Sequence, residues 1–165
     1  MSIAGDILAS YPAPGQVLRR RLAAGRREPR ALAVLMGACA LIFVGQWPRL
    51  ARDAAFDPAI GLDARLAGAF FAWILLAPLI FYLLALLSLG LLRLFGRGTA
   101  GFETRMALFW ALLAAAPVFL AAGLVTGFTG AGPLATAVGA LALLAFLWIW
   151  LGGLSAVAGR KGTAE

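Results

Sequence analysis

Four long apolar stretches constrain the fold of this 165-residue chain more than any other feature of its sequence. The stretches lie at about 31–47, 66–92, 106–126 and 133–157. Each is long enough, or nearly so, to cross a hydrocarbon core as a helix of about 20 residues. Because a backbone in lipid must satisfy its own hydrogen bonds, membrane spans are helices or closed barrels. We therefore predict an all-α, polytopic membrane protein with four transmembrane helices in one domain, residues 31–158. A basic N-terminal segment, 1–30, precedes this domain, and a short tail, 159–165, follows it.

The composition supports the membrane class. The chain is 63% hydrophobic and its mean hydropathy is +0.95, whereas soluble domains are roughly 45–50% apolar. The segments before and after the spans are too short to bury a soluble core of their own.

Most basic residues fall on one side of the predicted membrane. If the chain weaves back and forth, the N-terminal segment, the loop between the second and third spans and the tail share that side. It carries 11 of the 14 basic residues: Arg19, Arg20, Arg21, Arg26, Arg27, Arg30, Arg93, Arg97, Arg105, Arg160 and Lys161. Because cytoplasmic loops are enriched in Lys and Arg, this pattern predicts a cytosolic N-terminus. The strong preference for Arg over Lys is typical of a GC-rich bacterial genome, so we expect the bacterial inner membrane.

The net charge of +7 has two interpretations. A basic chain can bind nucleic acid, but here the arginines flank membrane spans. We therefore expect the lipid bilayer and its anionic headgroups as partners, and no nucleic acid. Each basic residue near an anionic membrane surface is attracted to it by about 1 kcal/mol.

The N-terminal segment is predicted to hold one short amphipathic helix. Pro12 and Pro14 stop a single helix from running through this segment. Residues 16–25 then combine apolar and basic side chains, which favours a helix lying on the membrane surface. The alternative is a disordered basic tail.

Tryptophans and prolines mark the ends and bends of the spans. We expect Trp47 and Pro48 to end the first span at the outer interface. Trp110, Trp148 and Trp150 are expected at the inner interface. The predicted kinks and packing positions are Pro78, Pro117, Gly123 and Gly127. Gly123 and Gly127 form a G-x-x-x-G pattern, which favours close helix approach within the chain or between copies.

The sequence predicts no catalytic, cofactor or metal site. The chain has no histidine, the commonest general base and a frequent zinc ligand. Residues 96–101 satisfy G-x-G-x-x-G, but a nucleotide fingerprint needs a preceding strand and a later acidic residue, so we interpret them as a turn. Asp53, Asp57 and Asp63 could suggest a cation site. Their spacing matches no known loop and each has an arginine nearby, which favours a solvated loop.

The turn between the second and third spans suggests a family. Residues 91–102 read LLRLFGRGTAGF, and ALFWAL follows at 107–112. This arrangement resembles the bacterial branch of the Yip (Ypt/Rab-interacting protein) family of integral membrane proteins. In that family a glycine-rich turn with Thr or Ser before an aromatic residue joins two central spans. The matching positions are Gly96, Gly98, Thr99 and Phe102. The opening YPAPGQVL, 11–18, is similar to the family's proline-containing cytosolic segment.

The resemblance implies a non-enzymatic integral membrane protein and carries over no catalytic residue. Family members usually have five spans. A fifth span here would come from splitting the second span at Pro78 or from the N-terminal segment, and it would move the tail to the outer side.

Two functions follow as hypotheses. The first is a protein that organises or scaffolds membrane or protein partners, including a second copy of itself. It would bind through its inner basic face and its small-residue helix surfaces. The alternative is a transporter, channel or lipid-translocating protein, in which prolines and glycines break helices around a midplane site.

Overall fold

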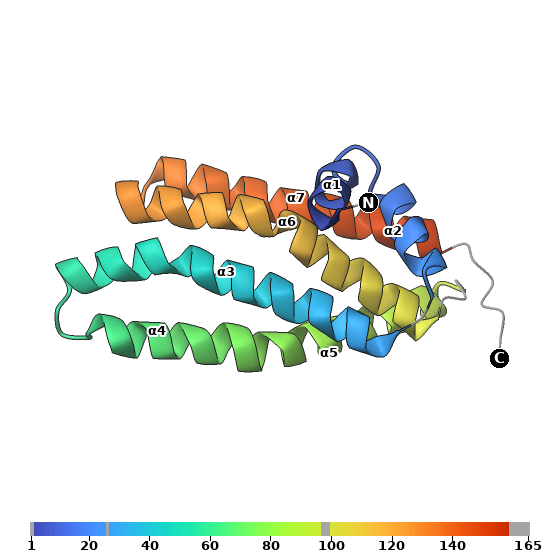
Figure 1. Ribbon diagram of the computed structural model, residues 1–165, viewed down its shortest axis with the longest axis horizontal. Helices are drawn as coiled ribbons and strands as arrows, with labels where there is room; N and C mark the ends of the chain where they lie inside the picture. The colour runs from blue at the N-terminus through green and yellow to red at the C-terminus, as the bar shows by residue number, and fades with distance from the viewer. Residues whose placement is uncertain (1, 26, 97–99, 159–165) are drawn as a thin grey trace.

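Helices make up the ordered fold throughout the part of the chain that the computed structural model describes, residues 2–25, 27–96 and 100–158. The helices in chain order are α1 (Ile3–Ser10), α2 (Pro14–Ala23), α3 (Glu28–Phe56), α4 (Leu62–Phe70), the π-helical η1 (Phe71–Leu76), α5 (Ala77–Leu94), α6 (Gly101–Thr129) and α7 (Pro133–Val157). Figure 1 shows the long helices running side by side in an elongated bundle, with α1 and α2 across one end. The predicted all-α class is confirmed.

Four helices are long and apolar enough to cross a membrane, counted over the described ranges. They are α3, α6, α7 and the continuous helix formed by α4, η1 and α5. The fifth span that the family resemblance allowed is absent from these ranges, because the second span is not split and because α1 and α2 have only 8 and 10 residues. As a result, the N-terminal helices and the end of α7 lie at the same end of the bundle (Figure 1).

Three of the four spans are longer than the apolar stretches that predicted them. α3 passes through Pro48 and ends at Phe56, nine residues beyond Trp47, where the sequence predicted the span to end. A proline costs the helix one hydrogen bond, and the packing of its neighbours can compensate for it. Beyond the proline, an ion pair between Arg49 Nε and Asp53 Oδ2, 3.5 Å apart, joins successive turns. Only α7 has the predicted bounds.

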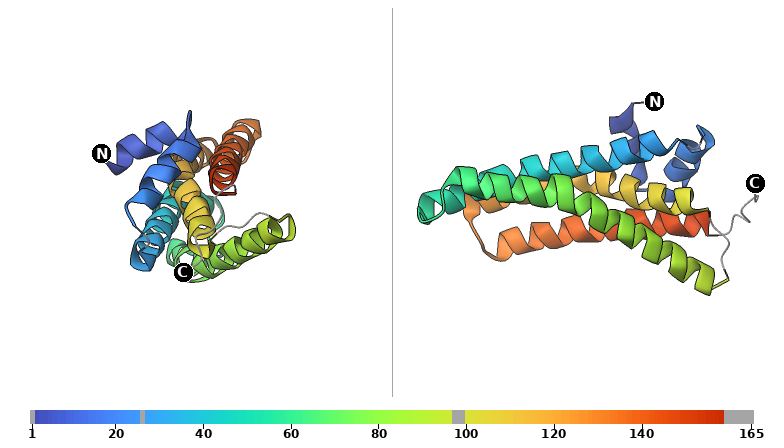
Figure 2. Two further views of the ribbon diagram at one scale, coloured as in Figure 1. Left: turned by 90° about the vertical axis from the view of Figure 1, so that its right-hand side faces the viewer. Right: turned by 90° about the horizontal axis from the view of Figure 1, so that it is seen from below.

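A π-helical stretch precedes Pro78 in the second span. η1 covers six residues, and Ala77 N–H bonds to Ala72 instead of the residue four positions back. Such π segments occur where the regular ladder of hydrogen bonds is disturbed, and they let a helix change direction. Figure 2 shows α5 diverging from α4 and from the rest of the bundle towards its end. The predicted irregularity at Pro78 thus begins in the turn before the proline.

α6 forms the centre of the bundle. All residues from Met106 to Ala116 are buried, which is expected of a helix that is apolar on every side and surrounded by others. α3 and α7 make the most extensive contacts with it. The view along the bundle in Figure 2 shows α6 between α3, α5 and α7.

The second half of α6 approaches α3 with almost no space between the backbones. A Cβ atom built on Gly123 would overlap the carbonyl oxygen of Gly45 and lie 2.7 Å from its carbonyl carbon. A Cβ atom on Gly127 would lie 2.8 Å from the carbonyl carbon of Pro48. The glycines of the G-x-x-x-G pattern therefore allow α6 to approach α3 closely within the chain.

The turn between α6 and α7 is held by an arginine from α3. Arg52 Nη1 donates to the carbonyl oxygens of Gly127 and Phe128, at 3.3 and 3.0 Å. A cation there complements the negative end of the helix dipole. Gly130 has φ +78°, which permits the three-residue turn into α7. The antiparallel hairpin of the last two spans is thus tied to the first.

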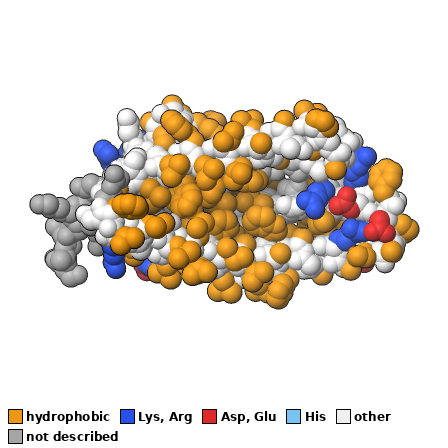
Figure 3. Space-filling view, turned by 180° about the vertical axis from the view of Figure 1, so that it is seen from behind, with side chains coloured by type: hydrophobic (Ala, Val, Ile, Leu, Met, Phe, Trp, Pro, Cys, Tyr) orange, Lys and Arg blue, Asp and Glu red, His pale blue; other side chains and the backbone are white. Residues whose placement is uncertain are grey.

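Charged and apolar side chains are segregated along the bundle. On the face drawn in Figure 3, an apolar band lies in the middle, and Arg, Asp and Glu lie towards the two ends. This distribution is what a membrane span requires.

Candidate functional site at the basic end

We call the end of the bundle that carries α1 and α2 the basic end. Its described charged residues are seven arginines and three acids: Arg19, Arg20, Arg21, Arg27, Arg30, Arg93, Arg105, Asp6, Glu28 and Glu103. The opposite end has three of each: Arg49, Arg52, Arg65, Asp53, Asp57 and Asp63. The predicted charge asymmetry is therefore present between the two ends. Arg26, Arg97, Gly98 and Thr99, also predicted as site residues, lie outside the described residues.

Residues 3–23 form a two-helix cap on the basic end. The sequence predicted a helix at 16–25; α2 begins two residues earlier, and α1 was not predicted. The cap also differs in what it contacts, because its apolar face packs on protein, whereas the sequence placed it on the membrane surface. Val17 and Leu18 are each only 1% exposed.

Two glycines of α7 allow α2 to dock. A Cβ atom on Gly152 would lie only 2.5 Å from Pro14 Cγ, and one on Gly153 would lie 3.2 Å from Leu18 Cδ2. Small residues late in α7 thus make a flat surface on which the cap packs.

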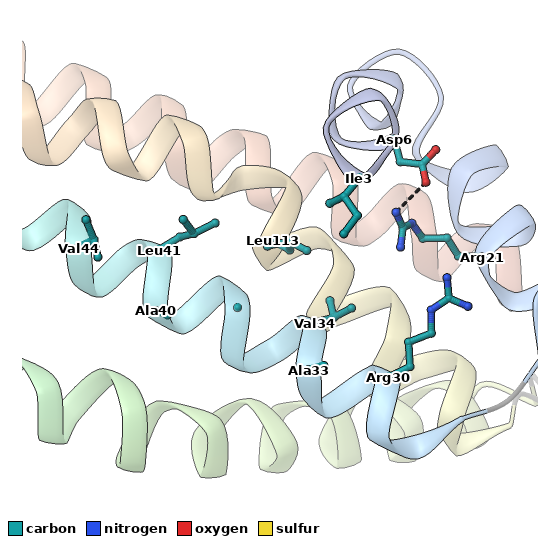
Figure 4. Close-up of a pocket in the computed structure, with 11 residues that line it drawn as sticks. Ile3, Asp6, Arg21, Arg30, Ala33, Val34, Ala40, Leu41, Val44 and Leu113 are labelled. Carbon is teal, nitrogen blue, oxygen red and sulfur yellow. Dashed lines mark hydrogen bonds and ion pairs between the residues drawn. The ribbon is translucent and has the colours of Figure 1, made fainter. Parts of the chain in front are cut away.

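Arg21 joins both cap helices to the bundle. Its Nη2 atom lies 2.7 Å from Asp6 Oδ2 of α1, and the two side chains are only 10% and 15% exposed. Its guanidinium carbon lies 3.5 Å from the centre of the Trp110 ring of α6. A cation stacked on an indole away from water gains about 2 kcal/mol. Figure 4 shows Arg21 reaching from α2 towards Asp6 beneath α1.

Two further hydrogen bonds lie beside Arg21, whose own buried Nε atom has no hydrogen-bond partner in the described residues. Trp110 Nε1 donates to Ser10 Oγ at 2.9 Å, and Ser10 Oγ donates to the Asp6 carbonyl oxygen at 2.7 Å. Trp110 is 1% exposed, so the predicted position at the lipid interface is wrong for this residue. The reason is that the cap covers it.

Burial lowers the pKa of Arg21 from its ordinary value. The charge of Asp6 and its hydrogen bond oppose this shift, while the positive charge of Arg30 adds to the lowering. A guanidinium nevertheless stays protonated in proteins. Arg21 is therefore a fixed cation with one neighbouring anion and one neighbouring cation.

Tyr11 attaches the linker between α1 and α2 to two spans. Its hydroxyl donates to the Ala114 carbonyl oxygen of α6 at 3.1 Å, and its own carbonyl accepts from Trp148 Nε1 of α7 at 3.0 Å. Burial raises the pKa of the Tyr11 hydroxyl, which keeps it protonated as a donor. Ala114 is adjacent to the carbonyl that Pro117 leaves without its helical donor. The cap thus docks near the proline of α6.

A groove of about 640 Å³ lies between the cap and α3. Its polar end is formed by Asp6, Arg21 and Arg30. Its apolar length is lined by Ile3, Ala33, Val34, Gly37, Ala40, Leu41, Val44 and Leu113. Figure 4 shows Ala33, Val34, Ala40, Leu41 and Val44 following α3 away from the basic end, with Ile3 of α1 and Leu113 of α6 facing them. The groove therefore changes from charged to apolar along its length.

The turn that carries the family resemblance adjoins this end. Gly96 has φ +69°, a conformation that favours glycine, and Phe102 is buried in the core. Arg105, three residues later, pairs with Glu28 at the start of α3. Arg93 is exposed on the last turn of α5. The described part of the turn thus contributes one packed aromatic residue and one ion pair between spans.

Sequence reasoning missed α1 and the special position of Arg21. A signal for α1 exists, since Ser2 precedes the helix and its Oγ accepts from Gly5 N–H at 3.2 Å, with Asp6 in the first turn. For Arg21 the signal is its spacing of three and four residues from Leu18 and Val17, which places it on the buried face of α2.

Comparisons of the chain with protein-family models, with curated proteins and with solved structures found no match.

Proposed function

We propose that this chain is a non-enzymatic integral membrane protein, of the type found in the Yip family, that organises protein or membrane partners. It would lie in the bacterial inner membrane with its basic end in the cytosol. The alternative of a transporter, channel or lipid-translocating protein receives less support, because Gly123 and Gly127 are used for close packing of α6 on α3.

One observation carries this proposal: the cap is fixed on the bundle and leaves its other arginines facing outwards. Arg19 and Arg20 of the cap are exposed, as is Arg27 just after it, whereas Arg21 is held between Asp6 and Trp110. A surface whose backbone is already ordered loses less entropy when a partner binds. Complementary charge then increases the rate and specificity of association. A rigid basic platform is suited to binding an acidic partner at the membrane surface.

The buried polar groups of the cap support a role in structure. Arg21, Trp110 and Ser10 bind one another or Asp6, and Tyr11 binds α6 and α7. Buried hydrogen bonds rigidify a fold, although Arg21 Nε has no partner among the described residues. They hold the cap in place, which is what a scaffold requires.

The orientation can be tested by reporter fusions. We expect fusions after Gly15 and Gly98, and at the tail, to report the cytosol, and fusions at Asp57 and Gly130 to report the outer side. Activity of an outer-side reporter at Gly98 would overturn the proposed orientation. This measurement depends on topology alone.

The partner can be tested by photo-crosslinking in the native membrane. A photoreactive residue at Arg19 or Ala23, both exposed on the cap, should yield one discrete adduct with a protein of acidic cytosolic surface. The same probe at Phe56 or Ala59, at the opposite end, should not. A chain that forms no cap-specific adduct and remains alone and monomeric in mild detergent would contradict the scaffold function.

A further inference from the structure

The groove between the cap and α3 places cations beside an apolar channel at membrane depth. Arg30 and Val44 lie fourteen residues apart on α3, or about 21 Å along a helix. One leaflet of the hydrocarbon core is about 15 Å thick. The groove therefore begins at the level of the headgroups and continues past the reach of a single leaflet.

Its polar end has an excess of positive charge. Asp6 pairs with Arg21, which leaves the charge of Arg30 unbalanced within the groove. The Arg30 side chain makes no ion pair or hydrogen bond with any residue in the described ranges. In Figure 4 its guanidinium extends towards that of Arg21. Two cations that face one another suit a shared anion, and arginine recognises phosphate well.

Its apolar part is open on α3. Ala33, Gly37, Ala40 and Val44 follow one another at helical spacing and form one face of the helix. A Cβ atom built on Gly37 would have no other atom within 4 Å. Small side chains thus leave room along this face for a narrow hydrocarbon chain, which gains about 0.8 kcal/mol for each buried CH₂ group.

We infer that this groove binds one anionic phospholipid, with its phosphate between Arg30 and Arg21 and one acyl chain along Ala33, Gly37 and Ala40 of α3. The inference rests on the proposed function and identifies a lipid partner for it. The lipid would bridge α3 and the cap, so its binding favours the docked position of α1 and α2. A headgroup phosphate and a free phosphate share the same chemistry, but only the lipid uses the apolar part of the groove.

The test is native mass spectrometry of the purified full chain, with phosphatidylglycerol and phosphatidylcholine offered in equal amounts. We expect one phosphatidylglycerol to be retained in preference to phosphatidylcholine. Arg30→Gln should weaken phosphatidylglycerol binding about fivefold, which corresponds to about 1 kcal/mol for one basic residue, and should remove the preference. Arg93→Gln removes an exposed arginine at the same end and outside the groove, so it should leave the preference unchanged.

A second pair of variants tests the acyl chain. Gly37→Leu places a side chain in the groove where a Cβ atom meets no other atom within 4 Å, and it should lower the retention of both lipids. Gly139→Leu introduces the same side chain into open space on α7 and should have no effect. Equal retention by the Gly37 and Gly139 variants would show that only a phosphate is held and would overturn the lipid site.

The outcomes separate this inference from the proposed function. Lack of preference in the native chain, or equal loss in Arg30→Gln and Arg93→Gln, overturns the site. Crosslinking of a protein partner to the cap does not depend on either result. Suppose that the chain binds phosphatidylglycerol as expected but forms no cap-specific adduct. This result would support the lipid site and contradict the scaffold function.

Discussion

Replacing Gly123 with alanine should destabilise the folded bundle by about 3 kcal/mol, near the upper limit for an overpacked core. The added methyl group would overlap the backbone of Gly45, and a backbone carbonyl cannot rotate away as a side chain can. α3 and α6 must therefore separate over their second halves. Unfolding of the purified chain by titration with sodium dodecyl sulfate, followed by tryptophan fluorescence, measures this change.

Gly139→Ala is the matched control, because it adds the same methyl group where no atom lies within 4 Å. Alanine is the better helix former by roughly 0.5–1 kcal/mol, so this variant should be slightly more stable than the native chain. If the two alanine variants unfold at the same detergent concentration, α3 and α6 do not make the close contact described at Gly123.

Replacing Arg21 with alanine should release the cap while the four long helices stay folded. Removing one member of a buried ion pair costs about 3–5 kcal/mol, and we expect about 2–3 kcal/mol because water reaches part of Asp6. The stacking on Trp110 is lost as well. Hydrogen exchange should therefore become about 30- to 150-fold faster for amides of residues 4–22 and stay unchanged in α6.

Arg65→Ala provides the comparison at the opposite end. Arg65 also binds an aspartate, with Nη2 2.8 Å from Asp57 Oδ2, but that aspartate is 60% exposed. Exposed pairs contribute about 0–1 kcal/mol. Cap exchange that does not change in Arg21→Ala, or that changes equally in Arg65→Ala, would show that Arg21 does not hold the cap.

The sequence predicts the spans well because their chemistry is set by the bilayer. The length and hydropathy of an apolar stretch report where lipid surrounds a helix, which is why four spans were predicted. They do not report where the helix itself ends. α3 continues through Pro48 because α6 packs against it there, and this contact depends on Gly127, a residue distant in the sequence.

The role of Arg21 in the site was harder to predict, because it too depends on contacts with residues distant in the sequence. Arg19, Arg20 and Arg21 are equivalent as charges, and a count of charges on each side treats them alike. Only the phase of α2 distinguishes Arg21, because it shares a face with the buried Val17 and Leu18. Its partner Trp110 belongs to another span, and Trp110 resembles an ordinary interfacial tryptophan until the cap is placed over it.

The attachment of the cap to α7 determines when the cap can dock during synthesis of the chain. Tyr11 is synthesised before its partner Trp148, which lies 137 positions later in the sequence. At about 5–20 residues per second, roughly 7 to 27 seconds pass before the ribosome supplies the second partner. During that interval the first two helices have no docking surface on α7. Docking of the cap therefore follows the insertion of α7, and a chain that stalls before α7 keeps α1 and α2 exposed to proteases and chaperones.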